Sequence, residues 1–200
     1  MSQQRSLTFH HGGGGLPYIP LEHCYFNGAA VSLGFKLTNT ITSLKVSFTG
    51  KNSNWIFGAR DYQTSSDRFT LQVGTGTAIA TNNISATTTT NIGSINNRID
   101  YSYDGSTIII QNSGSTYTSS NTRGFPNGNR IVVLGSIRNG STIQTANTLE
   151  GYFWGLEVEV NNTLSQKVIP VKDLSNVVCL YNTVTAEFLY PTIGTLLENP

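Results

Sequence analysis

The end of the chain carries its clearest structural pattern: Glu150-Gly-Tyr-Phe-Trp-Gly-Leu-Glu-Val-Glu-Val-Asn-Asn-Thr-Leu164, then Ile169-Pro-Val-Lys-Asp173, then Val178-Cys-Leu-Tyr-Asn-Thr-Val-Thr-Ala-Glu-Phe-Leu-Tyr190. Apolar and polar residues alternate in these pieces, and a period of two places neighbouring side chains on opposite faces of a β-strand. The pattern predicts consecutive antiparallel strands. It also predicts one shared face for Trp154, Leu156, Val158 and Val160.

The same alternation runs through the rest of the chain. Further strands are predicted at 31–37, 44–48, 55–60, 69–73 and 99–110. The last range is a hairpin around Asp104-Gly105, because both residues of this dipeptide accept the positive φ of a tight turn. The weakly patterned stretch 77–94 predicts an edge strand or a long loop, and 114–128 predicts a polar loop. No amphipathic helix of useful length is found.

The domain organisation follows from these strands. Residues 1–15 end in Gly12–Gly15, which predicts a flexible arm or linker that could serve as a docking segment. Residues 16–200 show regular turn spacing and no second linker, which predicts one antiparallel all-β domain, a sandwich or a barrel. Its core is expected to contain Phe35, Val46, Tyr101 and Trp154.

Composition excludes several classes of function. The chain has 200 residues, 38% hydrophobic and only 12% charged, with a formal net charge of +1. The charged fraction is about half that of a typical soluble domain. No basic cluster favours nucleic acid, and no apolar run approaches a membrane span or a secretory signal. Cys24 and Cys179 are expected to be buried thiols; the alternative is a disulfide that joins the first and last strands.

The terminal strands, together with Trp55-Ile-Phe-Gly-Ala-Arg60 and Leu16-Pro-Tyr-Ile19, resemble the concanavalin A-like (laminin-G-like) jelly roll found in phage tail, fibre and other virion proteins. The resemblance covers residues 16–193. It implies two curved antiparallel sheets packed face to face. Members of this family bind glycans, serve as adhesion domains or decorate virions, and some relatives cleave glycans, so the fold alone does not choose among these functions.

One pair of acids raises the question of catalysis. Glu157 and Glu159 lie two residues apart and therefore share a strand face, as the carboxylates of glycan-cleaving relatives do. Those relatives carry three acids in such a strand, and Asn161 stands where the third would be. A solvated strand face is the favoured interpretation. The chain offers no Gly-x-Ser-x-Gly elbow for a serine hydrolase.

Two kinds of binding site were considered in the loops. Calcium would need oxygen ligands, and Asp61 and Asp67 are candidates, but they lack a dense ligand loop and are better interpreted as surface turn residues. No cofactor is therefore predicted. Glycans are bound by aromatic faces together with amide and hydroxyl hydrogen bonds, with little need for charge. The predicted glycan-binding residues are Asn54, Arg60, Asp61, Tyr62, Tyr117 and Arg123.

The resemblance and the composition together predict a non-enzymatic structural protein of a phage virion. The expected role is a fibre, tail-tip or capsid-decoration component, assembled in the host cytoplasm. Residues 1–15 would contact other virion proteins, the jelly roll would face host surface glycans or a neighbouring subunit, and a homo-oligomer such as a trimer is expected. The alternatives are a free carbohydrate-binding or adhesion module and a glycan-cleaving enzyme that uses Glu157 and Glu159.

Overall fold

The computed structural model describes residues 16–51, 53–60, 68–74, 78–84 and 86–200. Every regular element in this part of the chain is a strand. The strands are β1 (Tyr18–Pro20), β2 (Cys24–Lys36), β3 (Ile41–Phe48), β4 (Trp55–Arg60), β5 (Phe69–Val73), β6 (Ala78–Asn83), β7 (Ala86–Asn91), β8 (Ile99–Tyr103), β9 (Thr107–Asn112), β10 (Ser115–Ser120), β11 (Ile131–Leu134), β12 (Arg138–Asn139), β13 (Thr142–Ile143), β14 (Leu149–Val160), β15 (Thr163–Asp173), β16 (Val178–Asn182), β17 (Glu187–Leu189) and β18 (Ile193–Leu197).

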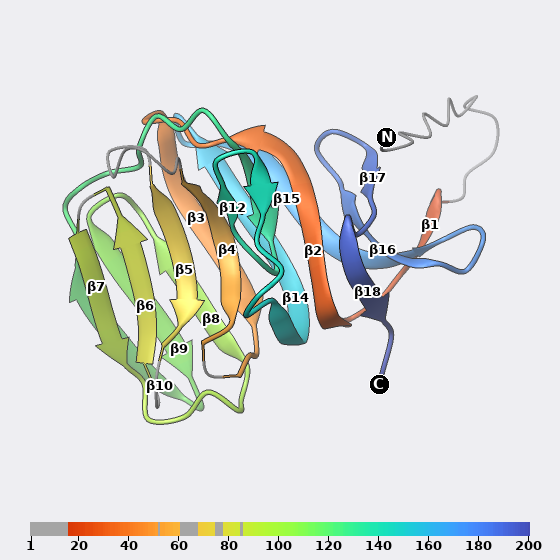
Figure 1. Ribbon diagram of the computed structural model, residues 1–200, viewed down its shortest axis with the longest axis horizontal. Helices are drawn as coiled ribbons and strands as arrows, with labels where there is room; N and C mark the ends of the chain where they lie inside the picture. The colour runs from red at the N-terminus through yellow and green to blue at the C-terminus, as the bar shows by residue number, and fades with distance from the viewer. Residues whose placement is uncertain (1–15, 52, 61–67, 75–77, 85) are drawn as a thin grey trace.

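Two antiparallel sheets pack face to face, and Figure 1 shows them as two layers. The first sheet has the order β10-β9-β8-β3-β14-β15-β16-β17, with β1 paired to the far half of β15. The second has the order β7-β6-β5-β4-β11-β2. The long strand β2 joins the sheets, because its first half pairs with β14 and β18 and its second half with β11. The all-β jelly-roll prediction is confirmed.

The core lies between the two sheets and is continuous. Inward side chains of the first sheet include Val46, Tyr101 and Leu156, each about 1% exposed, and they face Phe57 and Phe69 of the second. Burial of this much apolar surface is the main stabilising term of such a domain. Phe35 is only partly buried but packs against this core, as expected.

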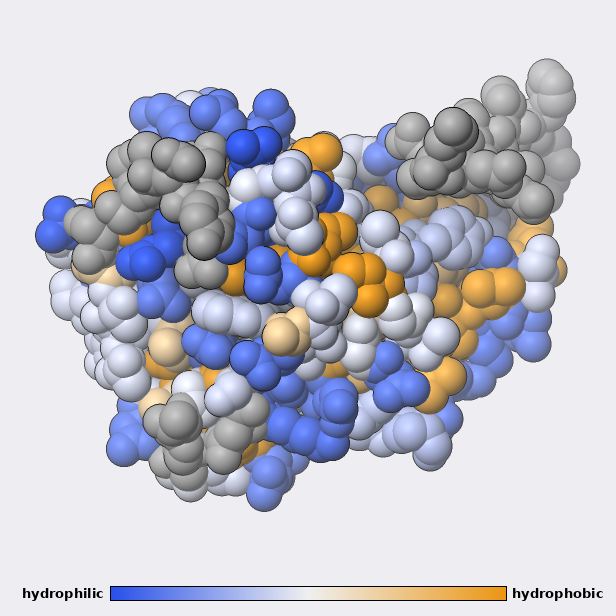
Figure 2. All heavy atoms as spheres, viewed as in Figure 1, coloured by the Kyte–Doolittle hydropathy of each residue, from blue (hydrophilic) through white to orange (hydrophobic). Residues whose placement is uncertain are grey.

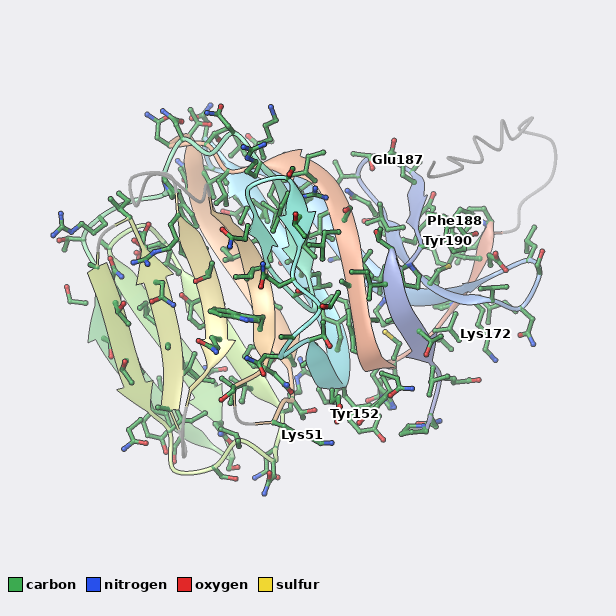
Figure 3. All side chains as sticks on the ribbon, viewed as in Figure 1. Lys51, Tyr152, Lys172, Glu187, Phe188 and Tyr190 are labelled. Atoms are coloured by element: carbon green, nitrogen blue, oxygen red, sulfur yellow. The ribbon has the colours of Figure 1, made fainter. Side chains whose placement is uncertain are left out.

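A second, smaller cluster lies under the outer strands of the first sheet. Val171, Cys179 and Tyr181 are buried there, and Tyr18 and Phe188 pack over them. The Tyr18 and Tyr181 ring centroids lie 4.5 Å apart. Phe188 of β17 and Tyr190, which follows that strand, are labelled next to each other in Figure 3. Both cysteines are free and buried, in agreement with the expectation of thiols rather than a disulfide.

Three sequence predictions need correction. Within 77–94 the chain forms a complete hairpin, β6 and β7, and within 114–128 it forms β10. These strands are rich in Thr, Ser and Asn and lack the apolar alternation by which strands are predicted. β7 and β10 meet where the two sheets close, with a hydrogen bond of 2.8 Å between Thr90 and Ser119. The third correction concerns Trp154, which does not point into the core.

The face of the molecule seen in Figure 2 is mostly hydrophilic or neutral, with hydrophobic residues gathered toward the side that carries β2, β16 and β18. Among the described residues no helix is long and apolar enough to cross a membrane.

Candidate functional site

A groove of about 550 Å³ crosses the outer face of the first sheet. Its lining comes from five strands and the residues beside them. Its polar and aromatic side chains are Lys45 and Ser47 of β3, Arg98 before β8, Asp100 and Ser102 of β8, Gln111 of β9, Trp154 and Glu157 of β14, and Lys167 of β15. The groove is therefore built on rigid strands, which hold side chains more firmly than loops do.

An irregularity in β14 places Trp154 in this groove. Phe153 pairs with Phe48 and Gly155 with Ser47, so Trp154 is an extra residue relative to β3. An inserted residue of this kind reverses the alternation of faces along the strand. Phe153 and Leu156 consequently point into the core, whereas the partly buried Trp154 lies on the outer face. Strict alternation, on which the prediction of a core Trp154 depended, fails at this bulge.

A polar network holds one side of the indole. The guanidinium carbon of Arg98 lies 5.2 Å from the centroid of the Trp154 ring, in cation–π geometry. Arg98 Nε donates to Asp100 Oδ1 over 2.9 Å, and Ser47 Oγ donates to the same oxygen over 2.5 Å. These contacts fix the guanidinium over the ring and fill one oxygen of the Asp100 carboxylate.

A row of charges crosses the groove at Glu157, three residues beyond Trp154 on β14. Glu157 pairs in register with Lys45 on one side and with Lys167 on the other. Glu157 Oε1 forms an ion pair with Lys167 Nζ at 3.0 Å. Glu159 lies further along β14, next to Ser43, and does not line the groove. The structure thus places one member of the predicted carboxylate pair in the groove, in an ion pair.

Aromatic residues continue the outer face beyond Trp154, toward β2. The ring of Tyr152 lies 6.0 Å from Trp154, 5.2 Å from Tyr25 and 5.0 Å from His23. Tyr152 and Lys51 both lie at the lower edge of the molecule in Figure 3. Edge-to-face and tilted packing of this kind holds each ring in place. The groove therefore has an aromatic end at Trp154, which these rings support from outside its lining, and a row of charges beyond Gly155.

Among the predicted glycan-binding residues that the structure describes, Asn54 and Arg60 lie apart. Asn54 precedes the six-residue strand β4, and Arg60 is its last residue. About 20 Å of extended chain separates the two. Asn54 is 7% exposed, and its amide bonds to the backbone of Lys51, Thr148 and Glu150. Those bonds give it a structural role.

The remaining predicted residues divide as follows. Arg123 is exposed, and the carbonyl of its neighbour Gly124 accepts a hydrogen bond from Asn83 at the end of β6. Tyr117 of β10 is partly buried and packs against the core. The side chain of Arg60, and Asp61, Tyr62 and Asp67, lie outside the described residues, so their binding role stays a prediction. Among the described residues no group of His, Cys, Asp and Glu is arranged to hold a metal ion.

The groove residues were missed because they are single polar positions on separate strands. Lys45, Arg98, Asp100 and Lys167 lie far apart in sequence, and only the register between β8, β3, β14 and β15 brings them together. The sequence does show that Lys45 and Ser47 face away from the core. Without the strand order, their partners on that face could not be identified.

No family model matches this sequence, and no curated protein matches it. Two solved structures similar to this chain are the mouse laminin α1 chain, domains LG4-5, and a heptameric SAP-like pentraxin from Limulus polyphemus. The laminin structure has a TM-score of 0.49 and 11% identity, over 72% of this chain and 44% of the laminin chain. The pentraxin has a TM-score of 0.41 and 16% identity, over 73% of this chain and 72% of its own.

The class that this chain's own architecture defines is an all-β jelly-roll domain, with a groove across the outer face of its first sheet. Both TM-scores lie below 0.5, so these likenesses indicate nothing about the function of this chain.

Proposed function

We propose that this protein is a non-enzymatic glycan-binding module and that the groove on the outer face of the first sheet holds the sugar. The observation that carries this proposal is the outward position of Trp154 beside Gly155. Sugars bind to aromatic surfaces through their C–H faces and to polar side chains through their hydroxyls. The groove offers both within one concave surface.

The polar side chains of the groove suit sugar hydroxyls. Asp100 has one oxygen filled by Arg98 and Ser47 and leaves the other to accept. Gln111 of β9 is in register with Asp100 and adds both a donor and an acceptor. Gly155 leaves space in the groove wall, because a Cβ built there meets, beyond its two chain neighbours, only the Val168 carbonyl oxygen within 4 Å, at 3.5 Å. A pyranose ring could enter this space without moving the backbone.

The test compares the two tryptophans of the chain. Trp154→Ala should weaken binding of a glycan found by array screening by roughly tenfold or more, as expected for loss of a stacking surface. Trp55→Ala is the matched control, because Trp55 is also partly buried but lies on β4 in the second sheet. Affinity is measured by calorimetry, and thermal unfolding confirms that both variants fold. Unchanged affinity in Trp154→Ala would refute this site.

The enzymatic alternative makes a different prediction. It requires Glu157 to act on the sugar, although Glu157 is held by Lys167. Release of reducing sugar from a bound glycan, with loss of that release in Glu157→Gln, would overturn the non-enzymatic proposal. Glycan binding without release of reducing sugar is the expected result.

The proposed setting is the surface of a phage particle, as a fibre, tail-tip or capsid-decoration component assembled in the host cytoplasm. The low charged fraction and the sequence resemblance to virion jelly rolls support it. Residues 1–15 would join the protein to other virion proteins, and the copies would form a homo-oligomer. Deletion of residues 1–15 should abolish incorporation into particles and preserve glycan binding. Normal loading of the truncated protein would contradict this docking role.

A further inference from the structure

We infer that the groove selects an acidic glycan, a sugar chain that carries carboxylate or sulfate groups. This inference rests on the proposed glycan-binding function and adds the charge of the ligand. It follows from where the few charges of this chain are placed and how they are paired.

Charge is concentrated in the groove. Five of its 15 lining residues are charged, whereas only 12% of the whole chain is. Three of the five are cations and two are acids. A neutral glycan needs few charges, and the other 18 charged residues of the chain are spread over its remaining 185 positions. The concentration of charge at one concave surface, with cations in excess, favours a ligand that carries negative charge.

Both acids of the groove already have cationic partners. Asp100 accepts hydrogen bonds from Arg98 and Ser47, and Glu157 forms an ion pair with Lys167. Internal pairing reduces the repulsion that these carboxylates would exert on an anion. Arg98 and Lys167 still hold further N–H groups, because a guanidinium has five donors and an ammonium three. The paired groups therefore present donors to the groove beside carboxylates whose charge is partly neutralised.

Lys45 is the surplus cation. It lies between Ser102 of β8 and Glu157 of β14, and it makes no ion pair with any residue that the structure describes. Glu157 lies in register between Lys45 and Lys167, and its ion pair is with Lys167. A carboxylate or sulfate at this position would complete the alternation of charges across the three strands.

The spacing fits one sugar chain that reaches both features. Gly155, beside Trp154, and Glu157, beside Lys45, are two residues apart on β14, or about 7 Å along the strand. A sugar ring stacked on the indole would place an acidic group of the same or the next ring near Lys45. Stacking then supplies affinity for the ring, and the lysine supplies preference for its charge.

The experiment uses matched pairs of oligosaccharides with the full-length protein. An oligogalacturonide is compared with its carboxyl-reduced form, and a sulfated galactan oligosaccharide with its desulfated form. The acidic member of at least one pair should bind several-fold more tightly at low salt, and the difference should shrink as salt rises. Equal binding within both pairs, or a preference insensitive to salt, would overturn the inference.

Two substitutions separate this inference from the proposed function. Lys45→Gln should weaken binding of the acidic member roughly fivefold more than binding of the neutral member, the size expected for one partly exposed charge pair. Lys36→Gln, at the end of β2 in the second sheet, is the control and should leave the preference intact. An equal effect of Lys45→Gln on both members would overturn the inference. Retained binding in Trp154→Ala would instead refute the proposed function.

Discussion

Trp154 and Leu156 lie two residues apart on β14 and face opposite sides of the first sheet. Leu156 is 1% exposed in the core, and Trp154 contacts Arg98 on the outer face. One inserted residue relative to β3 causes this reversal. The bulge leaves Gly155, which has no side chain, next to the indole. It therefore supplies both an aromatic surface and the open space beside it.

The open space at Gly155 gives the first prediction. Gly155→Val should reduce glycan affinity by roughly tenfold or more, because the branched side chain fills the groove beside Trp154. The fold should tolerate it, since a Cβ there makes only an ordinary contact with Val168 and valine favours strands. Calorimetry measures the glycan affinity, and thermal unfolding measures the stability of the variant. Gly155→Ala should lie between the wild type and Gly155→Val. Full affinity in Gly155→Val would place the ligand elsewhere.

The core could be predicted from the sequence to a large extent. The alternation of Leu44, Val46 and Phe48 and the hairpin at Asp104-Gly105 identify strands by local chemistry alone, and both are found in the structure. The groove could not be predicted, because Lys45, Asp100 and Lys167 meet only through pairing between strands distant in sequence. Register is decided by the packing of the whole sheet, which no local pattern reports.

The bulge itself shows the same limit. Nothing in the run from Tyr152 to Leu156 separates a regular strand from one with an inserted residue, although a glycine inside a strand is compatible with a bulge. Asn54 shows a different limit. The sequence does not reveal that this asparagine is buried and bonded to the backbone of Lys51 and of the distant Thr148 and Glu150.

The structural role of Asn54 gives the second prediction. Its Oδ1 accepts from the backbone N–H groups of Lys51 and Glu150, over 2.9 and 3.2 Å, and its Nδ2 donates to the Thr148 carbonyl over 2.9 Å. Asn54→Ala should lower the free energy of unfolding by about 2–3 kcal/mol, because these groups lose their partner. Glycan affinity should not change.

Chemical denaturation measures the Asn54 effect, and the exposed Asn27→Ala of β2 serves as its control. The control should alter the free energy of unfolding by no more than about 0.5 kcal/mol. A stable Asn54→Ala variant with weakened glycan binding would restore Asn54 as a ligand contact.

Two glycines with the same backbone angle give the third prediction. Gly34 and Gly135 both have φ +78°, a conformation that disfavours any side chain. A Cβ on Gly34 meets nothing within 4 Å, whereas one on Gly135 would collide with the Ala29 carbonyl oxygen and the Phe26 ring. Gly34→Ala should cost about 1 kcal/mol of stability, and Gly135→Ala about 3 kcal/mol or more. Equal costs would show that the packing around Gly135 can relax.

The fourth prediction concerns alkaline pH. Burial raises the pKa of Tyr103 to about 12, against a reference value of 10.0. Because this pKa is higher in the folded state, the contribution of Tyr103 to the free energy of unfolding is fully present below about pH 10 and is lost as the pH rises toward 12. Two pKa units correspond to about 2–3 kcal/mol from this residue. Burial also raises the pKa of Tyr101, which acts in the same direction.

Tyr103→Phe isolates this contribution. The phenol donates to the Asn121 carbonyl over 2.8 Å and accepts from Asn83 Nδ2 over 3.0 Å, so its loss should cost about 1–2 kcal/mol at neutral pH. Between pH 10 and 12 the variant should lose less stability than the wild type, because its side chain at position 103 no longer ionises. Denaturant unfolding at several pH values measures, for each protein, the slope of the free energy of unfolding against pH. Identical slopes would mean that Tyr103 ionises at the same pH in the folded and unfolded chains, and that the buried network of Tyr103, Asn83 and Asn121 admits water.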